Sequence, residues 1–181
     1  MDLFEYQGKS LYQKFNINHP NSKLIKNLND LNDPINLNFP VVVKAQVQVG
    51  GRGKAGGIKV AKDINELTQY SEEILGMDIK GHKVEILLLE EASNILEEYY
   101  ISFTLDRSEK KYLIMLSAKG GMDIEQVAEE NPDDLVKFHV SPSEKLTSST
   151  ISELINKANL NKDHEESLSE IIENLYLMFT E

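Results

Sequence analysis

The sequence contains no cysteine and no tryptophan among its 181 residues. Without cysteine there can be no disulfide framework, no zinc site built on thiolates and no cysteine nucleophile, and the reducing cytoplasm is the expected compartment. No apolar run approaches the roughly 18 residues that a transmembrane helix needs. The start, Met1 to Glu5, also lacks the basic and apolar regions of a signal peptide. We therefore expect a cytoplasmic protein that does not associate with membranes.

Positive charge is also scarce, with 19 Lys and Arg against 30 Asp and Glu and a net charge of −11. This balance argues against nucleic acids and anionic membranes as partners, because both are bound largely through basic side chains. The acidic excess is uneven, since residues 1–90 hold 11 basic and 11 acidic side chains and residues 91–181 hold 8 and 19. In the neutral half, no acidic residue lies between Asp33 and Asp63.

This acid-free window concentrates cations and glycines. Its cations are Lys44, Arg52, Lys54, Lys59 and Lys62, and its glycines, half of all those in the chain, are Gly50, Gly51, Gly53, Gly56 and Gly57. A glycine-rich loop exposes backbone N–H groups that, together with cationic side chains, can surround an anion. The window therefore predicts a site for a polyanionic ligand.

The elements around the window predict a hairpin. Residues 39–47 are apolar and β-branched, which indicates a buried strand, and residues 58–61 form a second short strand. Gly51 to Gly56 matches G-x-G-x-x-G, but a strand follows it, whereas a dinucleotide-binding motif needs a helix there. The Walker pattern fails as well, and the H-R-D and D-F-G motifs of protein kinases do not occur.

What remains is a strand carrying Lys44, a glycine loop and a second strand, and this order resembles that of ATP-grasp enzymes. The alternative is a mobile, exposed hairpin with solvated lysines. We favour the ATP-grasp interpretation, because Lys44 facing inward beside Val41 to Val43 would be costly to bury without an anionic partner.

The remaining pattern favours an α+β fold. Strand pairs alternate irregularly with helices, without the regular order of a doubly wound fold. Helices are predicted over residues 2–15, 63–75 and 123–130, and two more are predicted after residue 149. A helical turn is predicted around residues 28–33. Strands are predicted over residues 84–89, 98–105, 111–116 and 138–140.

A second candidate group is Glu90, Ser93 and Glu98, which follow the strand at residues 84–89. The strand end could present backbone groups to an adenine edge, and Glu98 could reach ribose hydroxyls. The alternative is that these acidic residues only form solvated faces. The four histidines have no metal-ligand spacing.

Three segments carry a resemblance to a known family. Met1 to Leu11, Val43 to Gly57 and Gly120 to Glu130 together are similar to the β subunits of succinate–CoA ligase, and Asp106 to Ser108 resembles that family's hairpin turn. The similarity covers the whole chain.

The resemblance implies an ATP-grasp domain over residues 1–181, with a nucleotide-flap subdomain at about 20–110 and the remainder in a second subdomain. It implies the reaction of ATP, succinate and CoA to succinyl-CoA, ADP and phosphate, a step of the tricarboxylic acid cycle, through a phosphohistidine on an α subunit that also carries the CoA site. It further implies a cytoplasmic α/β heterotetramer with no nucleic acid or membrane partner. Pro20 lies where the family's choice of nucleotide is influenced, and a proline at that position resembles the members that prefer ATP.

The same resemblance assigns site residues. Lys44 corresponds to the nucleotide-phosphate lysine and Gly51, Arg52 and Gly53 to the phosphate flap. Glu90 and Ser93 correspond to the adenine-side hinge, and Glu98 to the ribose contact. No catalytic residue is assigned. The family's Mg²⁺ ligands and its CoA-ligase domain correspond to positions after residue 181, so no metal ligand is expected here.

The apolar helix pattern continues to the last residues, from Leu175 to Glu181, without a cap signal. We therefore expect the chain to be about half of a β subunit and to show no ligase turnover alone. Two alternatives remain: a malate–CoA ligase β subunit, and a separate ATP-grasp module that binds nucleotide without turnover.

Overall fold

The computed structural model describes residues 3–122 and 124–181, and the chain forms two compact units. Unit 1 holds residues 3–14 and 18–94, and unit 2 holds residues 15–17 and the described part of 95–181. The units divide between residues 94 and 95, and the nucleotide-flap subdomain at about 20–110 stays a prediction. Residues 100–106 pair along their whole length with residues 111–117, so this hairpin stays within unit 2.

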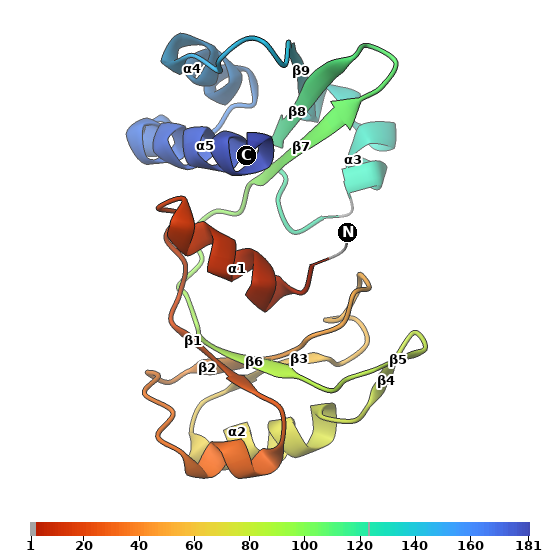
Figure 1. Cartoon of the computed structure of the whole chain (residues 1–181), viewed down its shortest axis with the longest axis vertical. Coiled ribbons are helices and arrows are strands. Elements are labelled where there is room, and N and C mark those ends of the chain that lie inside the picture. The colour runs from red at the N-terminus through yellow and green to blue at the C-terminus, as the bar shows by residue number, and fades with distance from the viewer. Residues whose placement is uncertain (1–2, 123) are drawn as a thin grey trace. The chain divides into compact units, whose positions relative to one another are not determined.

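Unit 1 is a four-stranded antiparallel sheet in the order β1-β6-β2-β3, with a separate two-stranded hairpin β4-β5. Helices α1 and α2 lie on opposite faces of the sheet (Figure 1). The elements are α1 (Glu5–Lys14), β1 (Ser22–Ile25), the 3-10 helix η1 (Leu28–Asn32), β2 (Val41–Ala45), β3 (Ile58–Ala61), α2 (Ile64–Ile74), β4 (Asp78–Ile79), β5 (His82–Lys83) and β6 (Leu87–Glu91).

Strand alternation explains how the sheet faces differ. In β2, Val41 and Val43 are fully buried in the core under α2, whereas Lys44 is only partly buried. Burying such an apolar side chain contributes about 1.5–3 kcal/mol. Helix α2 begins at Asp63, whose carboxylate accepts hydrogen bonds from the N–H groups of Asn65 and Glu66. The core therefore fixes β2, and with it the position of Lys44.

The predicted strand at residues 84–89 differs from the structure, in which β6 begins at Leu87 and includes Glu90 and Glu91. Val84 instead exchanges hydrogen bonds with the segment between α2 and β4, accepting from Gly76 N–H at 2.8 Å and donating to the Met77 carbonyl at 2.9 Å. These bonds extend a β4-β5 hairpin that the sequence pattern did not predict. Lys80 and Gly81 form its turn with φ of +54° and +83°, as a two-residue hairpin turn requires.

Unit 2 is a three-stranded antiparallel sheet in the order β7-β8-β9. Helices α4 and α5 contribute Ile155 and Ile172 to a core shared with Ile114 of β8. The elements are β7 (Tyr100–Asp106), β8 (Lys111–Ser117), α3 (Ile124–Glu130), η2 (Pro132–Asp134), β9 (Val136–Val140), α4 (Ser148–Lys157), η3 (Lys162–His164) and α5 (Glu165–Thr180).

Both units mix helices and strands as the α+β prediction states, and the predicted hairpin at residues 98–116 is confirmed. The helix predicted over 123–130 is present from Ile124, and its first residue, Asp123, lies outside the described residues. Met1 and Asp2 also lie outside them, and Asp2 is the first residue of the helix predicted over 2–15. Over the described ranges, none of the helices has both the length and the apolar content required to cross a membrane.

Candidate functional site

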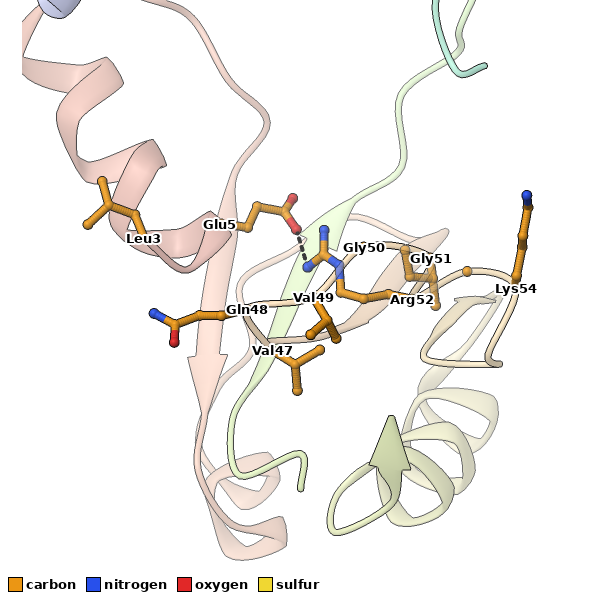
Figure 2. Close-up of a pocket in the computed structure, with 11 residues that line it drawn as sticks. Leu3, Glu5, Val47, Gln48, Val49, Gly50, Gly51, Arg52 and Lys54 are labelled. Atoms are coloured by element: carbon orange, nitrogen blue, oxygen red, sulfur yellow. Dashed lines mark ion pairs between the residues drawn. The ribbon is translucent and has the colours of Figure 1, made fainter. Parts of the chain in front are cut away.

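A cavity of about 600 Å³ lies beside the glycine loop of unit 1, which is within the usual size range of small-molecule sites. Loop residues Val47 to Lys54 form most of its lining, and Leu3, Glu5 and Ile58 complete it (Figure 2). The acid-free window predicted from the sequence therefore lines a cavity. One acidic residue, Glu5, enters that lining from α1.

The glycine loop folds back on itself between β2 and β3. Ala55 N–H donates to the Gly51 carbonyl at 3.1 Å, and Gly57 N–H donates to the Arg52 carbonyl at 2.8 Å. Gly51 has φ of +81°, a conformation that favours glycine. A Cβ on Gly57 would lie 2.6 Å from Ile79 Cδ1, so the base of the loop packs tightly against β4.

The first half of the loop keeps its donors available. Within the described residues, the N–H groups of Gly50, Gly51 and Gly53 donate to no backbone carbonyl. Arg52 and Lys54 stand among them, and no carboxylate belongs to the loop itself. Successive N–H groups next to cationic side chains form the kind of concave surface that binds phosphate.

Five charged side chains from four parts of unit 1 form an ionic cluster beside this loop: Glu5, Lys9, Lys44, Arg52 and Glu90. Lys44 Nζ donates to Glu90 Oε1 at 2.6 Å and to Glu5 Oε1 at 3.0 Å. Arg52 Nη1 lies 3.0 Å from Glu5 Oε2 and donates to the Ala45 carbonyl at 2.9 Å. Lys9 forms ion pairs with Glu90 and, at 3.6 Å, with Glu5.

The cluster supplies Lys44 with partners from its own chain. The sequence predicts an external anion that compensates a buried Lys44, but Glu5 and Glu90 provide that compensation. The Lys44 side chain is 18% exposed and the Glu90 side chain 7%. The positively charged window is thus partly neutralised by acidic residues that lie outside it in the sequence.

Electrostatics keep Glu5 ionised. Burial acts to raise the pKa of its carboxyl, but the charges and hydrogen bonds of Lys44 and Arg52 outweigh it and hold the pKa below its usual range. Burial lowers the pKa of the Lys9 ammonium, and repulsion from Lys44 adds to that effect. The lowered pKa keeps Glu5 negatively charged, so that it can pair with both Lys44 and Arg52.

The second group of candidate residues divides between the units. Glu90 lies in β6, in register with Ser22 of β1 and Val42 of β2, and its side chain belongs to the ionic cluster. Ser93 is exposed after the end of β6. Glu98 belongs to unit 2. The structure thus joins Glu90 to Lys44, while the adenine role of Glu90 and Ser93 stays a prediction.

Glu98 packs against the Gly120 and Gly121 pair that opens the third resemblance segment. Gly120 N–H donates to the Glu98 carbonyl at 3.0 Å. A Cβ on Gly120 would lie 2.4 Å from the Glu98 carbonyl carbon, and one on Gly121 would lie 2.6 Å from Glu98 Oε2. The two glycines therefore admit the Glu98 backbone and side chain, whose proposed ribose contact stays a prediction.

Sequence reasoning missed three residues that contact the predicted ones. Glu5 and Lys9 carry the i, i+4 spacing of an ordinary exposed helix pair, which gives no sign of their partners in β2 and β6. Lys80 donates from the β4-β5 turn to the Gly50 carbonyl at 2.9 Å. Only Gly81 after it, a typical turn residue, signals a hairpin at that position.

The described residues do not form a site for a divalent cation. Among residues 3–122 and 124–181, no group of three His, Asp or Glu side chains is placed to hold a metal ion. The carboxylates of the ionic cluster are engaged by Lys and Arg. The donor set present does not fit a Mg²⁺ site, and we derive no step through that ion.

Comparison with known proteins gives close matches. The chain is 40% identical over 182 residues to the β subunit of ADP-forming succinate–CoA ligase from Halorubrum lacusprofundi, covering 100% of this chain and 48% of that protein. It is 41% identical over 181 residues to the protein of the same name from Methanocaldococcus jannaschii, covering 100% and 50%. The chain thus spans about half the length of these curated relatives.

A solved structure shares the fold. The dinucleotide-forming acetyl-coenzyme A synthetase 1 of Ca. Korarchaeum cryptofilum, in complex with coenzyme A and Ca-AMPCP, aligns with a TM-score of 0.75 and 20% identity over 95% of this chain and 77% of that one. The model of the ATP-grasp domain matches residues 2–181. Nearly the whole chain fits this model, and the chain therefore belongs to the ATP-grasp domain family, whose fold implies nucleotide binding.

Proposed function

We propose that this chain is the nucleotide-binding part of the β subunit of an ADP-forming succinate–CoA ligase. The observation that carries the proposal is the cavity beside the glycine loop. Arg52 and loop N–H groups without a backbone acceptor line it, and Lys44 is paired with its lining residue Glu5. The names of the relatives at 40% and 41% identity support the choice of reaction.

The chemistry proposed for the site is phosphoryl transfer. In such reactions, positioning and charge neutralisation carry most of the catalysis. The loop N–H groups would hold the phosphate oxygens, and Lys44 and Arg52 would neutralise the charge that develops on them. Glu90 would keep Lys44 in place through their 2.6 Å contact. Ser93 and Glu98 would contact the adenine side and the ribose.

The remaining parts of the reaction belong to the whole enzyme. The proposal includes an α subunit that carries the phosphohistidine and the CoA site. It also includes Mg²⁺, for which the described residues supply no group of three ligands. The proposal also includes ATP as the preferred nucleotide, with Pro20 at the position that influences this choice. It further includes a cytoplasmic location, which fits the cysteine-free composition.

The test uses the full-length α/β complex and measures phosphorylation of the partner histidine by ATP. Lys44→Ala and Arg52→Ala should each slow phosphorylation by about 100-fold, the size of effect seen when one transition-state charge contact is lost. Lys62→Ala is the control, because Lys62 is an exposed lysine that does not line the cavity. Unchanged phosphorylation in the first two variants would remove these residues from the mechanism.

Two further assays separate the alternatives. The same complex should turn over succinate in preference to malate, and the opposite preference would make the protein a malate–CoA ligase. Residues 1–181 alone should bind ATP without ligase turnover. Measurable succinyl-CoA formation by the isolated chain would contradict this division of labour.

A further inference from the structure

The two cations proposed to bind phosphate already share one carboxylate. Glu5 uses one oxygen for Lys44 Nζ at 3.0 Å and the other for Arg52 Nη1 at 3.0 Å. A carboxylate that bridges two cations in this way presents one oxygen to each of them, as a phosphate group also can. Figure 2 shows the Glu5 carboxylate meeting the Arg52 guanidinium at the cavity.

The two carboxylates of the cluster are not equivalent. Glu90 is 7% exposed and is fixed in β6 between two strands, whereas Glu5 is 21% exposed and lines the cavity. If Glu5 withdrew, Lys44 and Lys9 would keep Glu90, and Arg52 would keep the Ala45 carbonyl. The cations would therefore keep a partner without Glu5, and of the three only Arg52 lines the cavity itself.

The attachment of α1 permits such a withdrawal. No residue of α1 is fully buried, whereas α2 buries Leu67 and Ile74 in the core. In addition to its ion pairs, α1 donates a hydrogen bond from Tyr6 N–H to Oε1 of Gln46, the residue after β2, at 3.2 Å. Ion pairs at partly exposed positions contribute little to stability and are weakened by competing ions.

We propose that Glu5 is an internal counter-anion that determines the affinity of the phosphate site. Its carboxylate neutralises Lys44 and Arg52 when no ligand is present, and the phosphate groups of a nucleotide displace it. This inference rests on the proposed nucleotide function of the same cavity. It follows that Glu5 opposes ligand binding, because any phosphate must compete with it and, where it stays near, is repelled by it.

The first experiment measures binding of ATP and of inorganic tripolyphosphate to the full 181-residue chain by titration calorimetry. Glu5→Gln keeps the length and hydrogen-bonding capacity of the side chain but removes its charge. This variant should bind both ligands about tenfold more tightly than the unsubstituted chain. Glu72→Gln on the exposed side of α2 is the control for the change in net charge and should alter the affinity less than twofold.

A second measurement needs no variant. Hydrogen exchange of the unsubstituted chain should show that saturating tripolyphosphate reduces the protection of residues 5–14, because α1 loses two of its ionic contacts. Unchanged or increased protection of α1 would overturn the displacement, as would an affinity of Glu5→Gln equal to or weaker than that of the unsubstituted chain.

The outcomes separate this inference from the proposal on which it rests. If the unsubstituted chain binds ATP and Glu5→Gln binds no tighter, the counter-anion role is wrong and the nucleotide site stands. If neither protein binds ATP or tripolyphosphate, the nucleotide site is wrong and the counter-anion role is wrong with it.

Discussion

Replacing Glu90 by glutamine tests whether the ionic cluster holds unit 1 together. The Glu90 side chain is 7% exposed, contacts Lys44 Nζ at 2.6 Å through Oε1 and pairs with Lys9 through Oε2. Removing one partner of a buried ion pair costs about 3–5 kcal/mol, because the other charge is left uncompensated. Both lysines keep an ion pair with Glu5, Lys44 at 3.0 Å and Lys9 at 3.6 Å. We therefore expect the free energy of unfolding to fall by about 3 kcal/mol, the lower end of that range.

The assay is thermal unfolding followed by calorimetry. For a unit of this size, 1 kcal/mol shifts the midpoint by about 4–8 °C, so Glu90→Gln should lower the unit 1 transition by about 12–24 °C. Glu91→Gln is a matched control on the next residue of β6, whose carboxylate accepts a hydrogen bond from the exposed Asn38 N–H. An equal, small shift in both variants would refute the view that the cluster is structural.

Further predictions concern the loop base and the β7-β8 turn. Gly57→Ala places a Cβ 2.6 Å from Ile79 Cδ1 and should lower the free energy of unfolding by about 1–2 kcal/mol. Gly50→Ala is the control, because a Cβ there has nothing within 4 Å, and it should change that free energy by less than about 0.5 kcal/mol. Equal midpoints of the two variants in urea unfolding would contradict the tight packing at Gly57. A hydrogen bond from the Ser108 hydroxyl is the main cause that lowers the pKa of the Asp106 carboxyl. Because the pKa of Asp106 is lower in the folded than in the unfolded chain, the ionised carboxylate stabilises the folded chain fully at pH values above the pKa of the unfolded chain. This contribution is lost as the pH falls below about 4. Melting midpoints of the unsubstituted chain should therefore fall more steeply below this pH than those of Asp106→Asn, and parallel curves would exclude the effect.

The sequence predicted those parts of the fold whose signals are local. The valine run before Lys44 specifies β2, the glycines specify the loop, and Asp63 specifies the start of α2. Each signal lies within a few residues of the structure that it produces, so periodicity and turn chemistry suffice.

Long-range pairing was not accessible in this way. Glu5 lies 39 residues from Lys44, and Glu90 lies 46 residues from it, so no local pattern shows that they surround one lysine. An acid-free stretch of sequence does not make an acid-free surface, because the fold brings the carboxylates of Glu5 and Glu90 to it. The two-residue strands β4 and β5 are too short to show any alternation.

The central claim is that phosphate groups bind at the glycine loop. Amide chemical shifts of the ¹⁵N-labelled chain, titrated with ATP, test it most directly. The largest shifts should fall on Gly50, Gly51 and Gly53, whose N–H groups have no backbone acceptor in the described part of the chain. Largest shifts around the separate cavity of about 490 Å³ beside α5, lined by Tyr112 and Tyr176, would contradict it.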